Sequence, residues 1–468
     1  MNLRVLRIDL KRSVAPWAGA AVLVVPLAFL GLLPGPWAGE GAPWTGQWTS
    51  MALWTRYPLF FLWPLAVGLG ALQGLRDPRS KMSELLTSTP RPGWQRALAQ
   101  AGPTALTLVA GFLLVVCVGA VRVFVGGASY GHLGWLPISL VGALALAAGA
   151  LLGMGVARAL PSVLTPPALA VAALVLTSLL RQNSDGALPA AAAPHALSLL
   201  SPAVAEVRES LLTLTASVHL GQTLWLLGMA ATGLALLAAA APRTRLLALA
   251  PVLAGTGAAL LLLPSTPRDT YVVDRVAAQQ VCEGPVCVTK AHEARLAELA
   301  GPGKEALRLL RGALGGRAPA AVHETTVPRA SLGEAERSPG FLLVDFDDPA
   351  FGAARAAGGD SARERELTRV LVGQGMAPLC RPRTGSESGT LEETVAQGIG
   401  AAWVLGDLKP LAGTMHEARF QTELARPAWE KLTALPRAEQ RGRMLALHTA
   451  ALSCADRPLD ALTGGGAR

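Results

Sequence analysis

Three histidine–glutamate pairs are the residues whose types best fit metal-dependent hydrolysis. They are His292-Glu293, His323-Glu324 and His416-Glu417. A metallopeptidase helix needs H-E-x-x-H, which places two imidazoles on one helical face beside a glutamate that acts as base. None of the three pairs is followed by a second histidine at this spacing. Exposed polar side chains are therefore the preferred interpretation, and His292, His323 and His416 are kept as weak metal candidates.

Four cysteines lie in the C-terminal part of the chain. They are Cys282, Cys287, Cys380 and Cys454. An even number of cysteines on the outer side of a membrane suggests disulfides. We favour Cys282–Cys287, which closes a small loop, and Cys380–Cys454, which ties the last helix to its domain. A zinc site is the alternative, because C-x4-C is within the usual ligand spacing, but a second close pair is missing.

Two catalytic motifs were sought in the sequence. There is no G-x-x-x-x-G-K-[ST], so the chain has no loop of the type that holds nucleotide phosphates. G-x-S-x-G, the motif that carries a nucleophilic serine in many hydrolases, occurs once, at residues 127–131, but between two predicted spans and not at the strand-to-helix turn that this motif needs. We therefore expect no catalytic residue and no cofactor bound by this chain.

The charge of the chain is divided unevenly between its two parts. Hydrophobic residues make up 51% of the sequence, and long uncharged runs place part of it in lipid. Residues 1–264 hold 16 Lys and Arg against 7 Asp and Glu, whereas residues 265–468 hold 25 of each. The net charge of +9 thus belongs to the apolar part. It indicates membrane topology, and no nucleic-acid partner is needed to explain it.

About seven transmembrane helices are predicted at the length of roughly 20 residues that a bilayer requires. They lie near 14–34, 56–75, 102–125, 135–158, 164–182, 219–241 and 245–264. Residues 1–13 are expected to form a basic amphipathic helix on the inner leaflet. With the N-terminus inside, twelve Lys and Arg lie in cytoplasmic segments and four outside, as the positive-inside rule favours.

This topology places residues 265–468 outside an inner (plasma) membrane. The last span, interrupted by Pro251, Gly255 and Gly257, is the least certain, and without it the C-terminal domain would be cytoplasmic. The cysteines argue against that alternative. Charged groups are costly inside a bilayer, and none is expected in the middle of a span. A transporter driven by protons is therefore disfavoured.

Tryptophans are frequent in the outer loop 35–55. They are Trp37, Trp44, Trp48 and Trp54. Because indole rings favour the headgroup layer, an outer aromatic belt is preferred over a ligand-stacking role.

The C-terminal part is predicted to be a soluble α+β domain. Short apolar runs predict strands over 286–289, 320–326 and 341–346. Helical periodicity predicts helices over 291–314, 363–373, 391–405, 426–435 and 437–455. We therefore divide the chain into a transmembrane domain, 1–264, and an extracytoplasmic domain, 265–468, in which we expect disulfides.

A basic loop within residues 76–100 separates two of the apolar runs. Met82, Leu85 and Leu86 fall at positions i, i+3 and i+4, which predicts a brief helix with an apolar and a basic face. Pro90 and Pro92 end this helix, because proline lacks a backbone donor and restricts the preceding residue. A compact element between two spans is one that a soluble partner could bind and move.

Glu84-Leu85-Leu86, followed by Ser88-Thr89-Pro90 and flanked by basic residues, resembles the first cytoplasmic loop of type-2 ABC transporter permeases. The resemblance covers roughly residues 50–125. It implies a coupling helix that docks on a separate ABC ATPase subunit, which would bind ATP and Mg²⁺. The partner-binding residues would be Arg79, Lys81, Met82, Glu84, Leu85, Leu86, Pro90 and Arg91.

The resemblance also implies a homodimer or a pair of permeases in the bilayer. In this family Ser201-Pro202 would begin one of two short outer helices before the last core span. Six spans are usual there, so a seventh and an added outer domain depart from the pattern. The expected function is that of a permease subunit of an exporter of peptides, antibiotics or other amphipathic substrates. A membrane-anchored hydrolase and a sensor or scaffold without transport stay open as alternatives.

Overall fold

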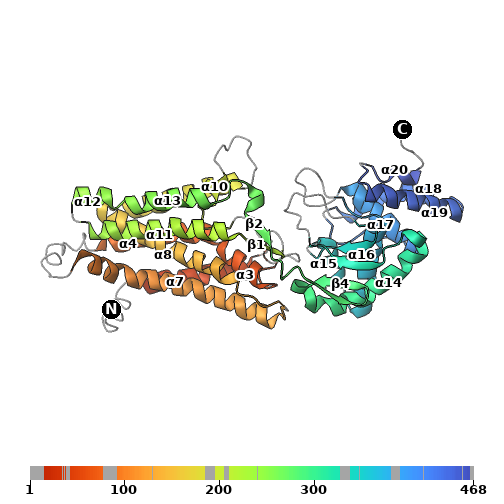
Figure 1. The fold of residues 1–468 in the computed structure, drawn as a ribbon, viewed down its shortest axis with the longest axis horizontal. Coiled ribbons are helices and arrows are strands. Elements are labelled where there is room, and N and C mark those ends of the chain that lie inside the picture. The colour runs from red at the N-terminus through yellow and green to blue at the C-terminus, as the bar shows by residue number, and fades with distance from the viewer. Residues whose placement is uncertain are drawn as a thin grey trace.

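The chain forms a bundle of helices joined to a smaller domain with a β-sheet (Figure 1). The computed structural model describes residues 15–33, 35, 37, 43–76, 92–128, 130–184, 195–204, 210–239, 241–326, 338–346, 348–380, 390–414, 416–455 and 457–463. The bundle and the domain lie one after the other along the long axis of the molecule. All described helices before residue 265 belong to the bundle.

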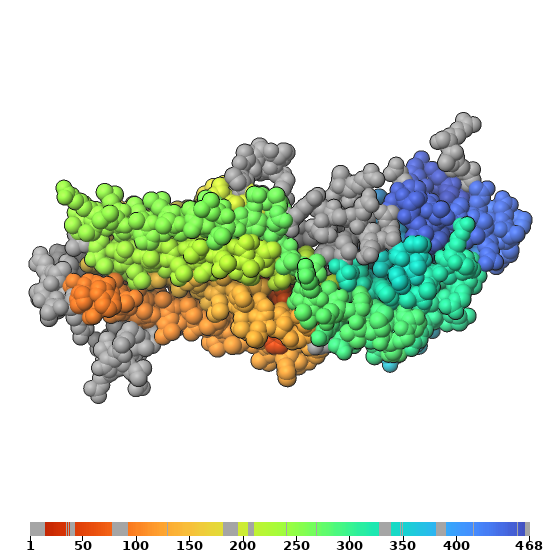
Figure 2. All heavy atoms as spheres, viewed as in Figure 1, coloured from red at the N-terminus to blue at the C-terminus, as the bar shows by residue number. Residues whose placement is uncertain are grey.

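The bundle is built from ten described helices. They are α2 (Ala15–Leu32), α3 (Trp48–Arg56), α4 (Leu59–Gly74), α7 (Gly93–Val125), α8 (Trp135–Ala159), α9 (Thr165–Ser184), α10 (His195–Ser198), α11 (Ala216–Ala238), α12 (Pro242–Leu247) and α13 (Ala250–Leu262). Figure 2 shows α7 and the α11–α13 segment on the visible face of the bundle. Exposed apolar side chains such as Leu114, Phe124 and Leu261 lie on these helices, as expected of a surface that faces lipid.

Five helical segments in the described residues are long and apolar enough to cross a membrane. They are Ala15–Leu32, Gly93–Val125, Trp135–Ala159, Ala216–Ala238 and Pro242–Leu262. Helices α3 and α4 would make a sixth, but they meet at an angle of 49°. The apolar part of α9, Thr165–Leu180, is shorter. The structure thus has the helical bundle expected of a membrane protein, and the number of seven spans stays a prediction.

The bend between α3 and α4 has a local cause. Pro58 has no backbone N–H to donate to the preceding turn, and its ring opposes a continuous helix. The predicted span 56–75 therefore starts at a break, and α3 forms a separate helix before it.

Glycines let α4, α8 and α11 approach one another at backbone distance. A Cβ atom on Gly153 of α8 would lie 2.1 Å from the carbonyl oxygen of Val67 on α4. A Cβ atom on Gly233 of α11 would lie 2.3 Å from the carbonyl oxygen of Leu151 on α8. Because lipid is as apolar as leucine, helix association in a membrane depends on such close packing.

The two ends of the bundle differ in charge. A Cβ atom on Gly93 would lie 3.3 Å from the Ala238 carbonyl, and Arg245 donates to the Ala159 carbonyl at 3.2 Å. The start of α7, the start of α12 and the ends of α8 and α11 therefore lie together. This end, named the basic end below, carries the described residues Arg76, Arg96, Arg158, Arg243 and Arg245. The sheet-containing domain joins the opposite end, after α13.

The C-terminal domain has a four-stranded sheet of order β3-β4-β5-β6. The strands are β3 (Gln280–Glu283), β4 (Val286–Thr289), β5 (Ala321–Glu324) and β6 (Phe341–Val344). β3 runs antiparallel to β4, whereas β4, β5 and β6 are parallel. The domain's described helices of seven or more residues are α14 (Leu296–Leu314), α15 (Pro349–Arg355), α16 (Asp360–Met376), α17 (Leu391–Leu405), α18 (Ala418–Thr433) and α19 (Arg437–Leu452). The short helix α20 (Asp460–Thr463) follows them.

The three strands predicted in this domain are present, and α17 has the predicted bounds. The helix predicted over 291–314 is present as α14, which connects the parallel strands β4 and β5, and residues Lys290–Arg295 before it form a 3-10 segment. The core packs Leu310 of α14 and Leu371 of α16 against buried strand residues such as Val322 and Val344. Two consecutive parallel strands need such a crossover, because the end of the first strand and the start of the second lie at opposite ends of the sheet.

A second, two-stranded sheet was not predicted. β1 (Leu212–Leu214), before α11, pairs antiparallel with β2 (Tyr271–Val273), after α13. The outer helix expected to begin at Ser201-Pro202 is not found in the described residues 201–204 and 210–211, and β1 begins at Leu212. Residues 212–214 have a strand partner that is distant in the sequence, and tertiary pairing overrides local helix propensity there.

Both disulfides have the pairing that the sequence analysis favours. Cys282 and Cys287 are a directly opposed pair in the β3–β4 hairpin, with Cα atoms 4.0 Å apart. Cys380 and Cys454, with Cα atoms 5.6 Å apart, join the segment after α16 to the residues after α19. The second bridge therefore ties the last long helix to the centre of the domain, which indicates that this region lies in an oxidising compartment.

The two disulfides should differ in their effect on stability. They close sequence separations of 5 and 74 residues, and a longer closed loop restricts the unfolded chain more. Replacing Cys380 and Cys454 by alanine should lower the free energy of unfolding of the domain by about 4 kcal/mol, and replacing Cys282 and Cys287 by about 2 kcal/mol. Urea titration of both double variants measures the difference. Equal losses would contradict the loop-length argument.

Backbone contact between α8 and α4 can be tested with two glycine variants. Gly153→Ala should destabilise the bundle by about 1–3 kcal/mol, because the added methyl group has no space beside Val67. Gly257→Ala, in α13, is the matched control, since nothing lies within 4 Å of its added Cβ. The control should be neutral or stabilising by up to about 1 kcal/mol, because alanine favours helices. Unfolding in mixed detergent micelles compares the two, and equal effects would exclude close packing as the cause.

Candidate functional site

The predicted coupling residues Arg79, Lys81, Met82, Glu84, Leu85, Leu86, Pro90 and Arg91 lie outside the described residues. The structure describes both flanks of that loop. α4 ends at Gly74 and α7 begins at Gly93, both at the basic end of the bundle. The predicted partner-binding loop is thus connected to the end of the bundle that is remote from the disulfide-bonded domain (Figure 1).

The three histidines proposed as weak metal candidates are not brought together. His292 lies in a short 3-10 segment, Lys290–Arg295, and is 4% exposed. His323 lies in β5 and stacks on the Phe341 ring, with centroids 4.2 Å apart. Side chains alternate along a strand, so His323 points away from the face that holds Glu324, the hydrogen-bond partner of His292. His416 precedes α18. In the described part of the chain no group of three or more His, Cys, Asp or Glu residues could hold a metal ion.

Both ring nitrogens of His292 have protein partners. Its Nδ1 lies 2.6 Å from Glu324 Oε1, so the assigned tautomer carries its proton there and donates to the carboxylate. Glu324 Oε2 in turn accepts from the Thr289 N–H at 2.6 Å. His292 Nε2 lies 3.1 Å from Gln47 Nε2 and accepts from this amide. A general base or metal ligand needs a free nitrogen, so His292 is a structural residue.

Gln47 belongs to the bundle, immediately before α3, and His292 belongs to the outer domain. The same amide nitrogen also donates to the Ala291 carbonyl at 3.3 Å. A further contact lies beside this one, since Tyr130 donates to Asp274 Oδ2 at 3.1 Å. We name these contacts of Gln47 and Tyr130 with the outer domain the joint. His132 supports the joint from within the bundle, because its ring stacks on Tyr130 with centroids 4.8 Å apart and its Nε2 lies 3.1 Å from Thr49 Oγ1.

The pKa values of two bundle residues at the joint, Tyr130 and His132, are shifted in the direction that favours the neutral side chain. Burial, together with the charge and hydrogen bond of Asp274, raises the pKa of the Tyr130 hydroxyl to about 12. Burial also lowers the pKa of His132, although the Asp274 charge opposes this shift. His132 Nδ1 accepts from the Gly134 N–H at 3.0 Å, and only a neutral ring can do so.

A buried arginine also lies at the domain end of the bundle. Arg56, at the end of α3, is 0% exposed. Its Nε and Nη2 donate to the Pro202 carbonyl at 3.1 and 2.7 Å, and Nη2 also donates to Gln222 Oε1 at 2.9 Å. Gln222 Nε2 donates to the carbonyls of Leu199 and Ser201 at 2.8 and 3.2 Å. This network fixes the segment before β1 against α3 and α11.

Little in the sequence points to Arg56 as a buried residue. Its place at the start of the predicted span 56–75 puts it in an outer segment, where arginines are ordinarily exposed to water or headgroups. The only local signal is an arginine placed directly before Tyr57-Pro58 and an apolar run, and such a signal does not show burial. Its partners come from residues 146 and 166 positions away.

The expectation of an outer aromatic belt is wrong for three tryptophans. Trp37, Trp44 and Trp54 are only 6%, 7% and 3% exposed, so they do not face lipid. Trp37 and Trp54 pack with Phe29 and Tyr57, with ring centroids 4.4 to 6.0 Å apart. These rings form an apolar core at the domain end of the bundle, because burying large aromatic surfaces stabilises the packed state.

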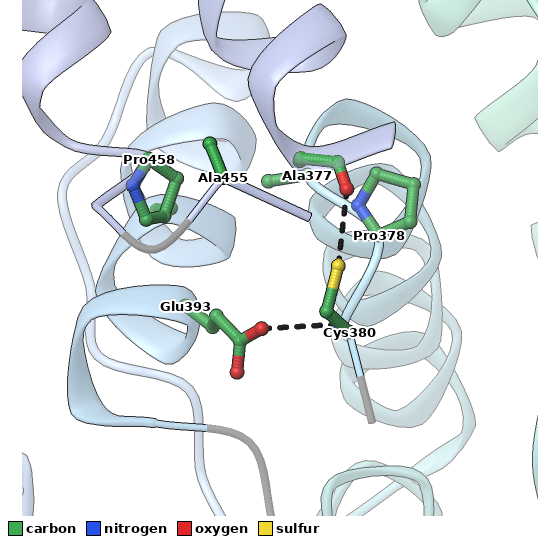
Figure 3. A pocket seen from close by; sticks show the side chains of 8 residues that line it. Ala377, Pro378, Cys380, Glu393, Ala455 and Pro458 are labelled. Carbon is green, nitrogen blue, oxygen red and sulfur yellow. Dashed lines mark hydrogen bonds between the residues drawn. The ribbon is translucent and has the colours of Figure 1, made fainter. Parts of the chain in front are cut away.

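A shallow pocket lies beside the Cys380–Cys454 disulfide (Figure 3). Its lining combines small apolar residues with Glu393, whose carboxylate accepts from the backbone N–H groups of Cys380 and Thr390 at 3.1 and 2.7 Å. Glu393 thereby completes the capping box of α17. Since this carboxylate satisfies two backbone donors, the pocket has a structural explanation.

No protein-family model, curated protein or solved structure matches this chain. Its function is therefore inferred from its own residues.

Acidification should loosen the joint. Because the folded-state pKa of His132 lies below its usual value of 6.5, the stability it contributes is present above pH 6.5 and is lost as the pH falls below it. Hydrogen exchange, corrected for intrinsic rates, should show weaker protection of residues 271–292 at pH 5.5 than at 7.5. His132→Asn, which keeps an acceptor but does not titrate, should reduce this difference.

His323→Asn is the matched control for this measurement, because His323 lies in the sheet and its ring stacks on Phe341. This variant should retain the wild-type pH dependence at the joint. If His132→Asn retained it as well, His132 would not be the group that responds.

Proposed function

We propose that this chain is the transmembrane permease subunit of an ATP-driven exporter of the type-2 ABC class. One observation carries the proposal. The two helix ends that flank the predicted coupling loop lie at the basic end of an apolar bundle, whereas the disulfide-bonded domain joins the opposite end. A nucleotide-driven partner on one side and an oxidising compartment on the other fit this division.

The proposed topology follows from the same division. The basic end carries five described arginines of the bundle, and the opposite end carries three, Arg56, Arg122 and Arg181. Under the positive-inside rule the basic end is cytoplasmic. The N-terminus is then cytoplasmic, the chain crosses the inner (plasma) membrane about seven times, and residues 265–468 are extracytoplasmic.

The coupling residues would act by contact with an ATPase subunit. Glu84, Leu85 and Leu86 would pack into a groove of that subunit, and Arg79, Lys81 and Arg91 would meet acidic groups around it. Met82 and Pro90 would shape the short helix between them. ATP and Mg²⁺ would be bound by the partner, and two permeases would pair in the bilayer. The substrate class proposed is a peptide, an antibiotic or another amphipathic molecule.

Rigid contact between α4 and α8 supports the transmission of movement from the loop. α4 leads directly into the loop from its N-terminal side. The backbone of α4 touches that of α8 at Gly70 and Gly153. Helices in backbone contact move together, because packed interiors do not deform continuously. A displacement of the loop would therefore reach the centre of the bundle.

Paired charge substitutions in the loop test the proposal. Leu85→Asp together with Leu86→Asp should abolish co-purification of an ATPase subunit, because two carboxylates cannot be buried in an apolar groove without a large cost. Leu246→Asp together with Leu247→Asp is the matched control, since both leucines are 72% exposed on α12 at the same end. The control should retain the partner.

The measurement is affinity purification of the full chain from its native membrane, followed by assay of bound ATPase activity. Wild-type protein that brings down no ATPase would contradict the proposed function. Loss of the partner in both double variants would show a general effect of added charge at the basic end.

A further inference from the structure

Arg56 has hydrogen-bonding capacity that the described chain does not use. A guanidinium carries five N–H donors and stays charged in proteins. The contacts to Pro202 and Gln222 engage Nε and Nη2, while Nη1 is buried and has no hydrogen-bond partner among the described residues. No ion pair joins Arg56 to a carboxylate in the described part of the chain. A buried charge without a counter-charge is costly, so a partner for Nη1 is required.

Two other buried polar atoms without partners lie on the helices that pack around Arg56. One is Ser139 Oγ on α8, and the other is His219 Nδ1 on α11. A Cβ atom on Gly142 would lie 3.4 Å from Arg56 Cγ, and Ser139 is one turn before Gly142 on the same helical face. His219 is one turn before Gln222, which binds Arg56 directly.

We infer that Arg56 is the centre of an anion-binding site at the domain end of the bundle, and that the site takes a carboxylate or phosphate group. Arg56 Nη1 and Ser139 Oγ donate to the oxygens of this group, and Gln222 holds the guanidinium in place. Trp54 and Tyr57, which flank Arg56 in the sequence, belong to the aromatic core at this end of the bundle and are apolar neighbours for a chain attached to the anion.

The chemistry of the Arg56 guanidinium determines which class of ligand the site would bind. A planar guanidinium matches the geometry of carboxylates and phosphates, and hydrogen bonds between charged groups are about twice as strong as neutral ones. In a bilayer such a group could belong to an anionic lipid headgroup or to a transported amphipathic acid. Since Arg56 is 0% exposed, the described state is the closed form of the site, and entry requires movement of residues 199–204.

This inference deepens the proposed function, because it gives the transported molecule an anionic group, but it is tested without an ATPase. The full chain is placed in phosphatidylcholine nanodiscs and melted with increasing octanoate. Octanoate should raise the melting temperature in a saturable manner, and octylammonium, the cation of equal length, should not. A second set of discs contains phosphatidylglycerol. If the headgroup fills the site, this lipid should raise the melting temperature and suppress the response to octanoate.

Variants assign the response to Arg56. Arg56→Gln should abolish it, and Arg56→Lys, which loses the planar fork, should weaken apparent affinity about tenfold. Ser139→Ala should weaken it about threefold, as expected for one lost hydrogen bond. Arg122→Gln, an exposed arginine on α7, is the matched control and should bind as the wild type does. Arg56→Lys and Ser139→Ala keep the test decisive if Arg56→Gln does not fold.

Three results would overturn the inference. The first is a wild-type protein that responds to neither octanoate nor phosphatidylglycerol. The second is an equal response in Arg56→Gln and the wild type, which would show an adventitious additive only. The third is a response that appears only when Glu206 and Glu209 are both replaced by glutamine, because a carboxylate of the chain itself would then be the partner of Arg56. None of these outcomes bears on the ATPase test, so the two proposals fail separately.

Discussion

Burial of a guanidinium that has no carboxylate partner among the described residues is the constraint on which the domain end of the bundle depends. Arg56 is removed from solvent, and its charge is held by the carbonyl of Pro202 and the amide oxygen of Gln222. These contacts require the segment before β1 to lie across α3 and α11. The pairing of β1 with β2 then brings the chain to the start of the outer domain. The contacts of Arg56 therefore hold together three separate parts of the chain, namely α3, α11 and the segment before β1.

The joint follows from this arrangement. With β1 and β2 paired, Asp274 lies near Tyr130, and the short 3-10 segment of His292 lies near Gln47. All of these are polar contacts, and beside them Leu211, Ala277, Ala291 and Tyr130 form a small apolar cluster. The domain is thus attached to the bundle by a few hydrogen bonds together with this cluster, and its position relative to the bundle depends on both.

The two ends of the bundle are built for different environments. At the basic end, arginines surround the helix termini beside the predicted coupling loop. At the other end, aromatic side chains form an apolar core, and the domain beyond it is closed by two disulfides. Between these ends, α4, α8 and α11 are in backbone contact through glycine. A stiff centre between two specialised ends is an arrangement suited to passing movement across a membrane.

Periodicity, charge and cysteine spacing determined a large part of this description. The apolar runs predicted the helices of the bundle, and short β-branched runs predicted β4, β5 and β6. The distribution of lysine and arginine predicted which end is basic. Cys282 and Cys287 are close in sequence, so their pairing follows from a tight hairpin. All of these features depend on residues near one another in the chain, where local physics is sufficient.

Only the tertiary structure decided the remaining features. The break at Pro58 falls at the start of the predicted span 56–75, and residues 201–204, where an outer helix was expected to begin, are not helical. The burial of Arg56, Trp37 and Trp54 depends on contacts with residues far away in the sequence. A side chain's own neighbours do not reveal whether a distant segment will cover it. For this reason the sequence identified the helices and the basic loop, whereas the buried arginine became visible only in the folded chain.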